Sequence, residues 1–306
     1  MTGSHRSGTT WVGEMLSRSG EVVSIHEPFN PDLPASWLEQ PPARWYHHVG
    51  DAGDRPLAED LRRVCALRPA VGAMLRRARS PRAAARVAVE SARALEGRVR
   101  RRRALLKDPI AFFSAEWIDA ELDADVLVLV RHPAAFAGSL QRLGWAFDFT
   151  NLTSQPALLD GLAARFADEL RAAAVEPGDI IDQAVLLWRV IATVASGYAE
   201  CHPDWQVRRY EDLAADPTTQ VPALAQALGL RWSEDATASV AELTSAELGA
   251  EVADGDKGGV ARDSRAAMWT WRARLSDADI DRIRRGTDDV SGHFYGDEDW
   301  DPPATA

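Results

Sequence analysis

The sequence predicts an α/β fold with a central, mainly parallel sheet flanked by helices. Three observations support this. Short apolar runs alternate with helical patterns along the 306 residues. The clearest run, 126–130, is apolar throughout, which is typical of a strand buried on both faces. A glycine-containing loop, 3–8, opens directly into a helical pattern. With 46% hydrophobic and 26% charged residues, the chain is long enough to bury a substantial core.

The elements follow from periodicity and from proline positions. Pro133 stands where a first helical residue is expected, because its missing N–H costs nothing there. We predict a single domain over 1–287, a mobile loop rich in glycine and charge over 247–263, and an acidic, frayed tail over 288–306. Strands are predicted at 21–26, 104–107, 125–130 and 205–210, and helices at 9–19, 56–99 (broken near Pro69 and Pro81), 112–122, 133–143, 155–174 and 179–200.

The net charge of −11 is unevenly distributed. Between Arg76 and Arg103, eleven arginines face only Glu90 and Glu96, a local balance of +9. This segment is a solvated helical face, an amphipathic helix on an anionic membrane surface, or a site for a polyanionic acceptor. A nucleic-acid partner is disfavoured, because the whole chain is acidic and shows no recognition motif.

The sequence also indicates a compartment. Cys65 and Cys201 lie far apart and indicate no disulfide framework. No apolar run reaches the ~18 residues of a membrane span, and the N-terminus is too polar for a signal peptide. We therefore expect a cytoplasmic protein.

The N-terminal segment Gly3-Ser4-His5-Arg6-Ser7-Gly8-Thr9-Thr10 has the glycine spacing of a phosphate-binding loop. Backbone N–H groups at a helix N-terminus form an anion cradle, to which Ser7, Thr9 and Thr10 add hydroxyls and Arg6 a fixed charge. The lysine of an ATPase loop is missing, and the strand ending at Val130 is followed by Arg131 rather than a metal-binding acid. The loop therefore suits an anion but poorly supports ATP·Mg²⁺ chemistry.

The string from Arg6 to Trp11 resembles the 5′-phosphosulfate loop of sulfotransferases that use 3′-phosphoadenosine 5′-phosphosulfate (PAPS). Three further segments resemble motifs of this family and come in its order. They are Val130-Arg131-His132-Pro133 followed by Ser139 (the 3′-phosphate motif), Arg209-Tyr210-Glu211-Asp212-Leu213 (a strand-to-helix turn), and Lys257-Gly258-Gly259 followed by Trp269 and Trp271 (a loop that closes over the nucleotide).

The resemblance implies a P-loop NTPase-like sulfotransferase architecture and sulfuryl transfer from PAPS to a hydroxyl, less often to an amine, without a metal. It places Trp11 on the adenine, although a core-facing helical tryptophan is the plain alternative. By the same resemblance, the 5′-phosphosulfate is held by Ser7, Gly8, Thr9 and Thr10, and the 3′-phosphate end of the nucleotide by Arg131, Ser139, Tyr210, Lys257 and Gly258.

The chain departs from the family pattern in two places. Family members carry a hydrophobic strand before the loop, whereas Met1 stands two residues before Gly3, so we expect that strand to be absent and the native start to lie upstream. The cytosolic subfamily carries a Lys-x-His pair, and here Lys107 is followed by Asp108 and Pro109. The catalytic base must therefore come from elsewhere.

Glu27 is our candidate for the base, since it resembles the glutamate base of Golgi-type and many bacterial sulfotransferases. Partial burial would raise its pKa and strengthen it as a base; the alternative is that Glu27 only stabilises the proline-rich loop after it. His26 is the rival base, expected on the opposite face of the strand. Arg6 and Lys107 are expected to stabilise charge on the sulfuryl group and the bridging oxygen. Asp108 either orients Lys107 or the acceptor, or caps the helix after it.

Aromatic residues cluster in two segments, 37–48 and 145–149. Flat aromatic faces suit sugar rings or lipid-like molecules, although core packing is the commoner use of tryptophan. We therefore expect a small-molecule, carbohydrate or glycolipid acceptor. Two other functions stay open: a small-molecule kinase with a P-loop, and a non-catalytic, nucleotide-binding relative.

Overall fold

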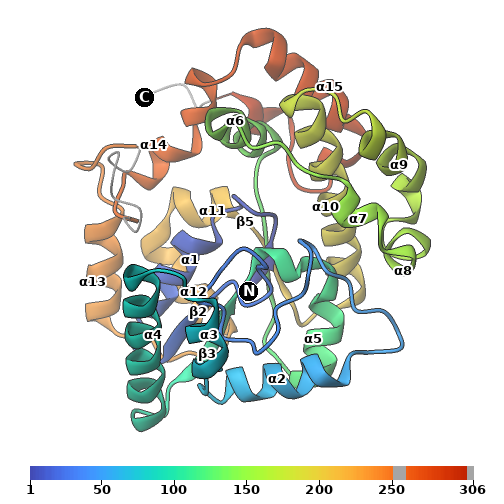
Figure 1. The fold of residues 1–306 in the computed structure, drawn as a ribbon. Helices are drawn as coiled ribbons and strands as arrows, with labels where there is room; N and C mark the ends of the chain where they lie inside the picture. The colour runs from blue at the N-terminus through green and yellow to red at the C-terminus, as the bar shows by residue number, and fades with distance from the viewer. Residues whose placement is uncertain (251–259, 302–306) are drawn as a thin grey trace.

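The computed structural model describes residues 1–250 and 260–301. Its five strands run parallel, in two pieces (Figure 1). One piece has the order β1-β4-β5, with β1 at Thr2–Gly3, β4 at Leu127–Val130 and β5 at Gln206–Arg209. The other pairs β2 (Val22–His26) with β3 (Arg103–Lys107). The predicted α/β class with a mainly parallel sheet is confirmed.

Helices surround the sheet (Figure 1), and several of them begin after a residue whose side chain caps the first turn. The long predicted helix at 56–99 is three helices, separated at Pro69 and Pro81 as expected. The longer helices are α1 (Thr9–Ser17), α2 (Arg55–Cys65), α3 (Val71–Arg77), α4 (Pro81–Val99), α5 (Ala115–Leu122), α6 (Pro133–Leu143), α9 (Ala167–Val175), α10 (Ile180–Cys201), α12 (Pro217–Ala227), α13 (Glu234–Leu243) and α15 (Asp277–Ser291). The short helices are α7 (Thr150–Thr153), α8 (Pro156–Asp160), α11 (Tyr210–Ala215) and α14 (Ser264–Met268), with 3-10 turns at Pro109–Ser114, Ala164–Phe166, Thr270–Ala273 and Asp297–Trp300.

Strand β4 shows why the sheet is covered on both faces. Leu127 and Leu129 pack into a cluster with the apolar residues of α1, α12 and α13. Val128 and Val130, which alternate with them, pack into the cluster that holds α6, α10 and α15. Because successive side chains of a strand point to opposite faces, a strand between two helical layers must be apolar at every position.

Two predictions about helices and the tail are wrong. The predicted helix at 155–174 is broken after α8, at Gly161, because Leu158, Leu159 and Phe166 must all reach the core. The predicted domain end at 287 falls inside α15, and the tail that follows is not frayed: burial of Tyr295 and Trp300, each 3% exposed, holds it against the body as far as residue 301.

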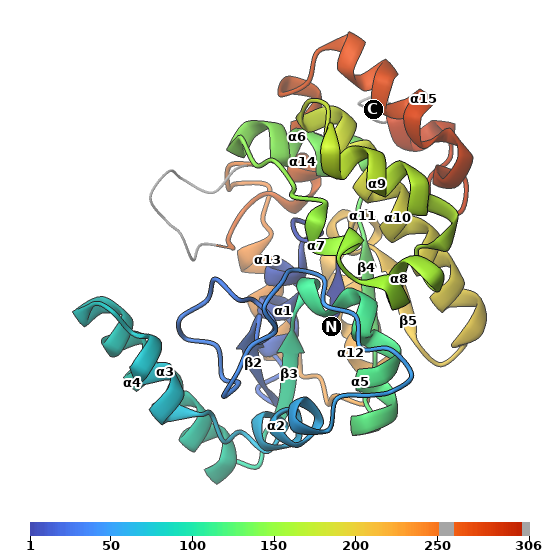
Figure 2. The ribbon, with the colours of Figure 1, turned by 45° about the vertical axis from the view of Figure 1, so that its right-hand side comes forward.

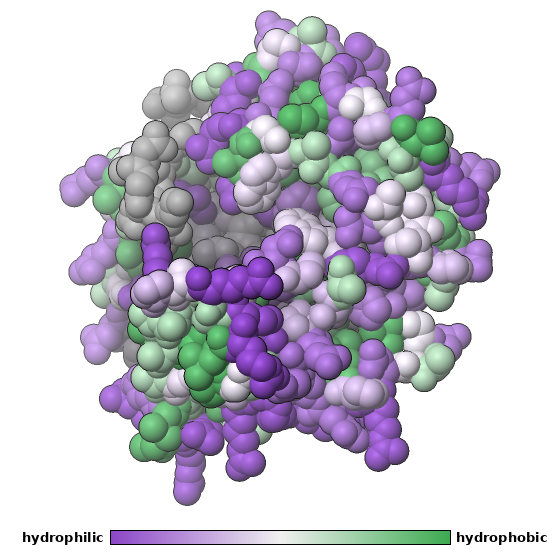
Figure 3. Space-filling view, viewed as in Figure 1, coloured by the Kyte–Doolittle hydropathy of each residue, from purple (hydrophilic) through white to green (hydrophobic). Residues whose placement is uncertain are grey.

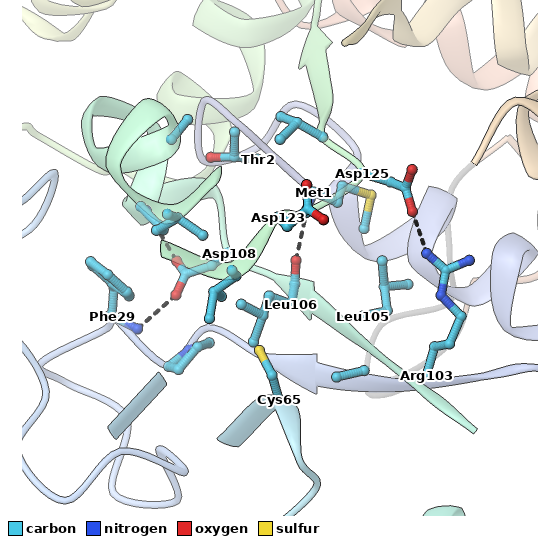
Figure 4. A pocket seen from close by; sticks show the side chains of 18 residues that line it. Met1, Thr2, Phe29, Cys65, Arg103, Leu105, Leu106, Asp108, Asp123 and Asp125 are labelled. Atoms are coloured by element: carbon cyan, nitrogen blue, oxygen red, sulfur yellow. Dashed lines mark hydrogen bonds and ion pairs between the residues drawn. The ribbon is translucent and has the colours of Figure 1, made fainter. Parts of the chain in front are cut away.

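The expected absence of the first strand is also wrong. Thr2 and Gly3 form β1, opposite Val128 and Leu129 of β4. Residue Met1 links this strand to β3, because its amine donates to the Leu106 carbonyl at 2.9 Å. A cavity of about 370 Å³ lies beside β1, between β3 and the residues that precede β4 (Figure 4). Cys65 and Arg103 are among the residues that line it.

One helix of the described residues, α10, is long and apolar enough to cross a membrane. Most of its apolar window, 61%, is buried inside the protein, where it packs between α6 and α15. This is the environment of a core helix. Figure 3 shows a hollow in the surface below α6.

Candidate functional site

The N-terminal loop ends in a helix start that is free to bind an anion. Helix α1 begins at Thr9, no side chain caps it, and its first internal bond runs from the Val12 N–H to the Gly8 carbonyl at 3.0 Å. Gly8 has φ 95°, and a Cβ there would lie 2.3 Å from the Tyr210 ring. The Ser7 hydroxyl is fully buried without a partner. The loop therefore presents unpaired donors at a helix N-terminus, where an anion is stabilised.

Arg6 ties this loop to the second predicted motif. Its backbone is left-handed, at φ 65°, which directs its side chain toward α6. The Arg6 Nε donates to the Ser139 hydroxyl at 2.9 Å, and Arg131 donates to the Arg6 carbonyl at 2.7 Å. Residues that the sequence places in two separate motifs are thus in direct contact.

Positive charge accumulates around this contact. Burial, together with the charges of Arg131, Arg142, Arg262 and Arg274, lowers the pKa of Arg6 to about 10. The last three of these arginines belong to none of the predicted motifs. Arg262 follows the glycine-rich segment and could have been found from it. Arg142 lies in α6 and Arg274 directly follows a 3-10 turn, and neither belongs to a motif. Guanidinium groups gathered in this way create a local positive field that favours an anion.

The Tyr210 ring packs against the Arg131 guanidinium. The Arg131 guanidinium lies 5.1 Å from the centroid of the Tyr210 ring, and the Tyr210 hydroxyl accepts from Arg262 at 3.3 Å. Trp11 meets the same ring edge-on at 5.5 Å and is only 1% exposed. Its indole is part of the core beneath the loop, so the structure supports the core-facing alternative for Trp11 rather than an open stacking face.

Glu27 and Lys107 meet at the carboxyl ends of β2 and β3. The Lys107 amine donates to Glu27 at 2.8 Å and to the Thr10 hydroxyl at 3.3 Å. Asn30 donates to the other carboxylate oxygen of Glu27 at 2.9 Å. Because parallel strands end at one edge of the sheet, this pair comes to lie beside the loop at the start of α1.

The expectation that burial would raise the pKa of Glu27 is wrong. Burial pushes the pKa up, but the charges of Lys107 and His26 and the bonds from Lys107 and Asn30 bring it below the usual value. Burial in turn lowers the pKa of Lys107, against the raising effect of Glu27. Glu27 is therefore a carboxylate at neutral pH, and its lowered pKa makes it a weaker base than burial alone would.

His26 does not face away from Glu27 as predicted. Strand β2 ends at His26, and Glu27 has φ 45°, so alternation stops there and the His26 Nε2 lies 3.8 Å from the Glu27 carboxylate. Burial and the charge of Lys107 lower the pKa of His26 to about 4.

Asp108 has the capping role. It accepts from the N–H groups of Ile110 and Ala111 at 3.0 and 3.2 Å, and from that of Phe29 at 2.6 Å. Burial raises the pKa of Asp108 to about 7. Through Phe29, Asp108 fixes the turn after Glu27 to the end of β3.

His5 is the loop residue that the sequence analysis left without a role. Burial lowers its pKa to about 3, so the ring is neutral. The Tyr46 hydroxyl accepts from the His5 backbone N–H at 3.0 Å and lies 2.7 Å from its Nδ1. Because the buried tyrosine needs an acceptor for its own proton, it donates to Nδ1, and Nε2 carries the imidazole proton.

The two aromatic segments come together beside the loop. Tyr46 packs against Phe147 at 5.8 Å, and both are buried, as core packing predicts. Trp145 is exposed and Trp45 is half-buried: Trp45 meets the His5 ring at 5.6 Å, and the Arg6 guanidinium lies 5.7 Å from the Trp145 centroid. These two indoles flank consecutive residues of the loop.

The predicted motif that begins at Lys257 lies only partly within the described residues. Lys257 and Gly258, with Gly259, lie outside the described residues. Trp271 is buried and stacks on His132 at 5.2 Å, so it belongs to the core.

This combination, an uncapped helix start with desolvated arginines at the carboxyl ends of a parallel sheet, is typical of a site for a phosphate-like anion. The model of the sulfotransferase family matches residues 1–234, and the chain belongs to this family. No curated protein and no solved structure matches it.

Proposed function

We propose that this sulfotransferase takes PAPS as donor and transfers its sulfuryl group to a hydroxyl of a small-molecule, carbohydrate or glycolipid acceptor in the cytoplasm. The observation that carries the proposal is the contact of Arg6 with both Ser139 and Arg131. This contact would join an anion site at the start of α1 to a second one formed by Arg131 and Ser139, as a donor with two separated anionic groups requires.

The residues present fit such a donor. The buried Ser7 hydroxyl and the buried Nε of Arg131 both lack partners. Unpaired buried donors are costly in a folded protein unless a ligand uses them. When bound, PAPS would supply the activated sulfuryl group.

Glu27, Lys107 and Arg6 then have distinct tasks. Glu27, held ionised by Lys107, accepts the proton of the acceptor hydroxyl. Lys107 lies between Glu27 and Thr10, so its charge reaches both the proton acceptor and the loop. Arg6 places a second positive charge at the loop. Donors fixed in this way act without reorganising during the transfer.

The direct test is calorimetric binding of 3′,5′-adenosine bisphosphate, with ATP·Mg²⁺ as comparator. Tight binding of the bisphosphate and weak binding of ATP supports the donor assignment. Preference for ATP·Mg²⁺ contradicts it and favours a kinase.

Glu27→Gln separates the base from the binding site. We expect turnover with labelled sulfate donor to fall by about 10²–10⁴-fold, while bisphosphate affinity stays nearly unchanged, because the amide keeps the shape but cannot take the proton. Glu14→Gln, on the partly exposed side of α1, is the matched control and should keep full activity. Normal turnover of Glu27→Gln would remove Glu27 from the mechanism.

A further inference from the structure

Helices α3 and α4 project from the body and carry most of the exposed apolar surface (Figure 2). The described residues leave seven large apolar side chains exposed, and five of these lie on the two helices. In Figure 3 apolar side chains gather over α3 and at one end of α4. The five are Val71 (38% exposed), Leu75 (50%), Val89 (57%), Leu95 (54%) and Val99 (75%).

Helix α4 is anchored by one face and leaves an apolar face unpartnered. Val87, Ala94 and Gly97 are buried, and Gly97 lies so close to Val23 of β2 that a Cβ would come within 2.4 Å of it. On the opposite face, exposed apolar residues recur at intervals of three and four, which places them in one stripe. The stripe consists of Ala85, Ala88, Val89, Ala92, Leu95 and Val99.

Arginines border this stripe. Their spacing puts Arg82, Arg86, Arg93 and Arg100 along one side of it, and all four are exposed. Glu96 is the acid on the exposed face, and Arg100 and Arg102 neutralise it at 3.3 and 3.6 Å. The segment 76–103 carries +9 and the chain −11, so the remainder carries about −20.

We propose that the α3–α4 face docks on an anionic lipid bilayer. An apolar stripe with flanking arginines suits the boundary between acyl chains and headgroups, whose phosphates pair with the guanidinium groups. Docking of a second copy on the same face would bring two +9 surfaces together. A nucleic acid would use the arginines but would leave the valine and leucine stripe exposed to water.

The docked face lies beside the candidate site. Arg93 donates to the Ser24 carbonyl of β2 at 3.3 Å, and the charge of Arg86 lowers the pKa of both His26 and Lys107. Docking would therefore bring the carboxyl ends of β2 and β3 toward the bilayer, where an amphiphilic acceptor is held. The inference itself stands on α3 and α4 and does not require the proposed donor.

Sedimentation with vesicles tests the docking. The full chain is mixed with vesicles of phosphatidylcholine alone, or of phosphatidylcholine with phosphatidylglycerol, at low and high salt. We expect binding to the mixed vesicles only, weakened by salt because the arginines lie at the surface. No binding to mixed vesicles at low salt would overturn the proposal.

Two variants locate the contact. Leu95→Glu and Val89→Glu place a carboxylate in the stripe, and each should reduce vesicle binding about tenfold or more. Val175→Glu on α9 is the matched control, because Val175 is 88% exposed but lies outside the two helices. Equal loss in Val175→Glu, or a wild-type dimer in gel filtration that Leu95→Glu dissociates, would contradict docking on lipid. Equal thermal midpoints of the variants exclude loss through unfolding.

Discussion

The arginines of the candidate site and those of α4 carry the same charge in opposite surroundings. Arg6 and Arg131 are held by hydrogen bonds to Ser139 and to the loop backbone, and burial lowers the pKa of both. Arg82 and Arg86 stand in water on an exposed helix. Fixed, desolvated charges recognise an anion of one shape, whereas solvated charges on flexible stems act on any negative surface. Local context, and not residue type, therefore separates a specific site from a diffuse one.

Replacing one arginine in each region tests this difference most directly, and we expect the largest effect here. We expect Arg131→Ala to weaken the binding of 3′,5′-adenosine bisphosphate about 100-fold, because a buried partner of the anion is lost. Arg82→Ala should change it less than about twofold, as for a screened surface charge. Calorimetry at moderate salt measures both. Equal losses of affinity in the two variants would mean that the overall charge of the protein, and not a specific site, determines binding.

The second prediction concerns the packing that fixes the site. Gly8→Ala forces a Cβ against Tyr210 at a left-handed φ, so it should destabilise the protein by about 2–3 kcal/mol. Gly20→Ala is the matched control, since Gly20 has φ 71° but nothing within 4 Å of a Cβ. It should cost about 1 kcal/mol from backbone strain alone. Urea unfolding distinguishes the two, and equal costs would show that the Tyr210 contact is unimportant.

The smallest expected effect concerns the dependence of stability on pH. Burial and the charge of Arg209 lower the pKa of His132 to about 3. Between pH 6.5 and the folded pKa the unfolded state binds the additional proton, so stability is full above pH 6.5 and falls as the pH decreases. At about pH 5 this loss should reach about 1–2 kcal/mol.

His132→Phe keeps a ring against Trp271 but cannot titrate, so it should reduce that loss. The measurement is the difference in unfolding free energy between about pH 7.5 and pH 5, in which any constant cost of the substitution cancels. An unchanged difference would show that His132 is not the group that titrates.

Much of the fold could be predicted from local pattern. The apolar run at β4, Pro133 at the start of α6 and the breaks at Pro69 and Pro81 all act within a few residues, and the structure confirms them. The errors came from distant contacts. Gly161 interrupts a helix because Phe166 must reach the core, and Trp300 holds a segment whose acidic composition predicted a frayed tail.

In the candidate site, too, the identity of the residues could be predicted from the sequence, whereas their interactions could not. The loop, Arg131, Ser139, Glu27 and Lys107 were recognisable as residues, because motif and strand-end position are properties of the chain itself. That Lys107 lowers the pKa of Glu27 could not be read from the sequence, since the two are eighty residues apart and meet only through the pairing of β2 with β3.

The sequence by itself determined the alternation of strands and helices, the glycine loop and the charge of the arginine segment. Only the tertiary structure decided which charges are buried, which tryptophans face solvent and which face of α4 is left apolar. The physical reason is that periodicity and turn chemistry are short-range, whereas burial and pairing depend on what the rest of the chain places opposite each residue.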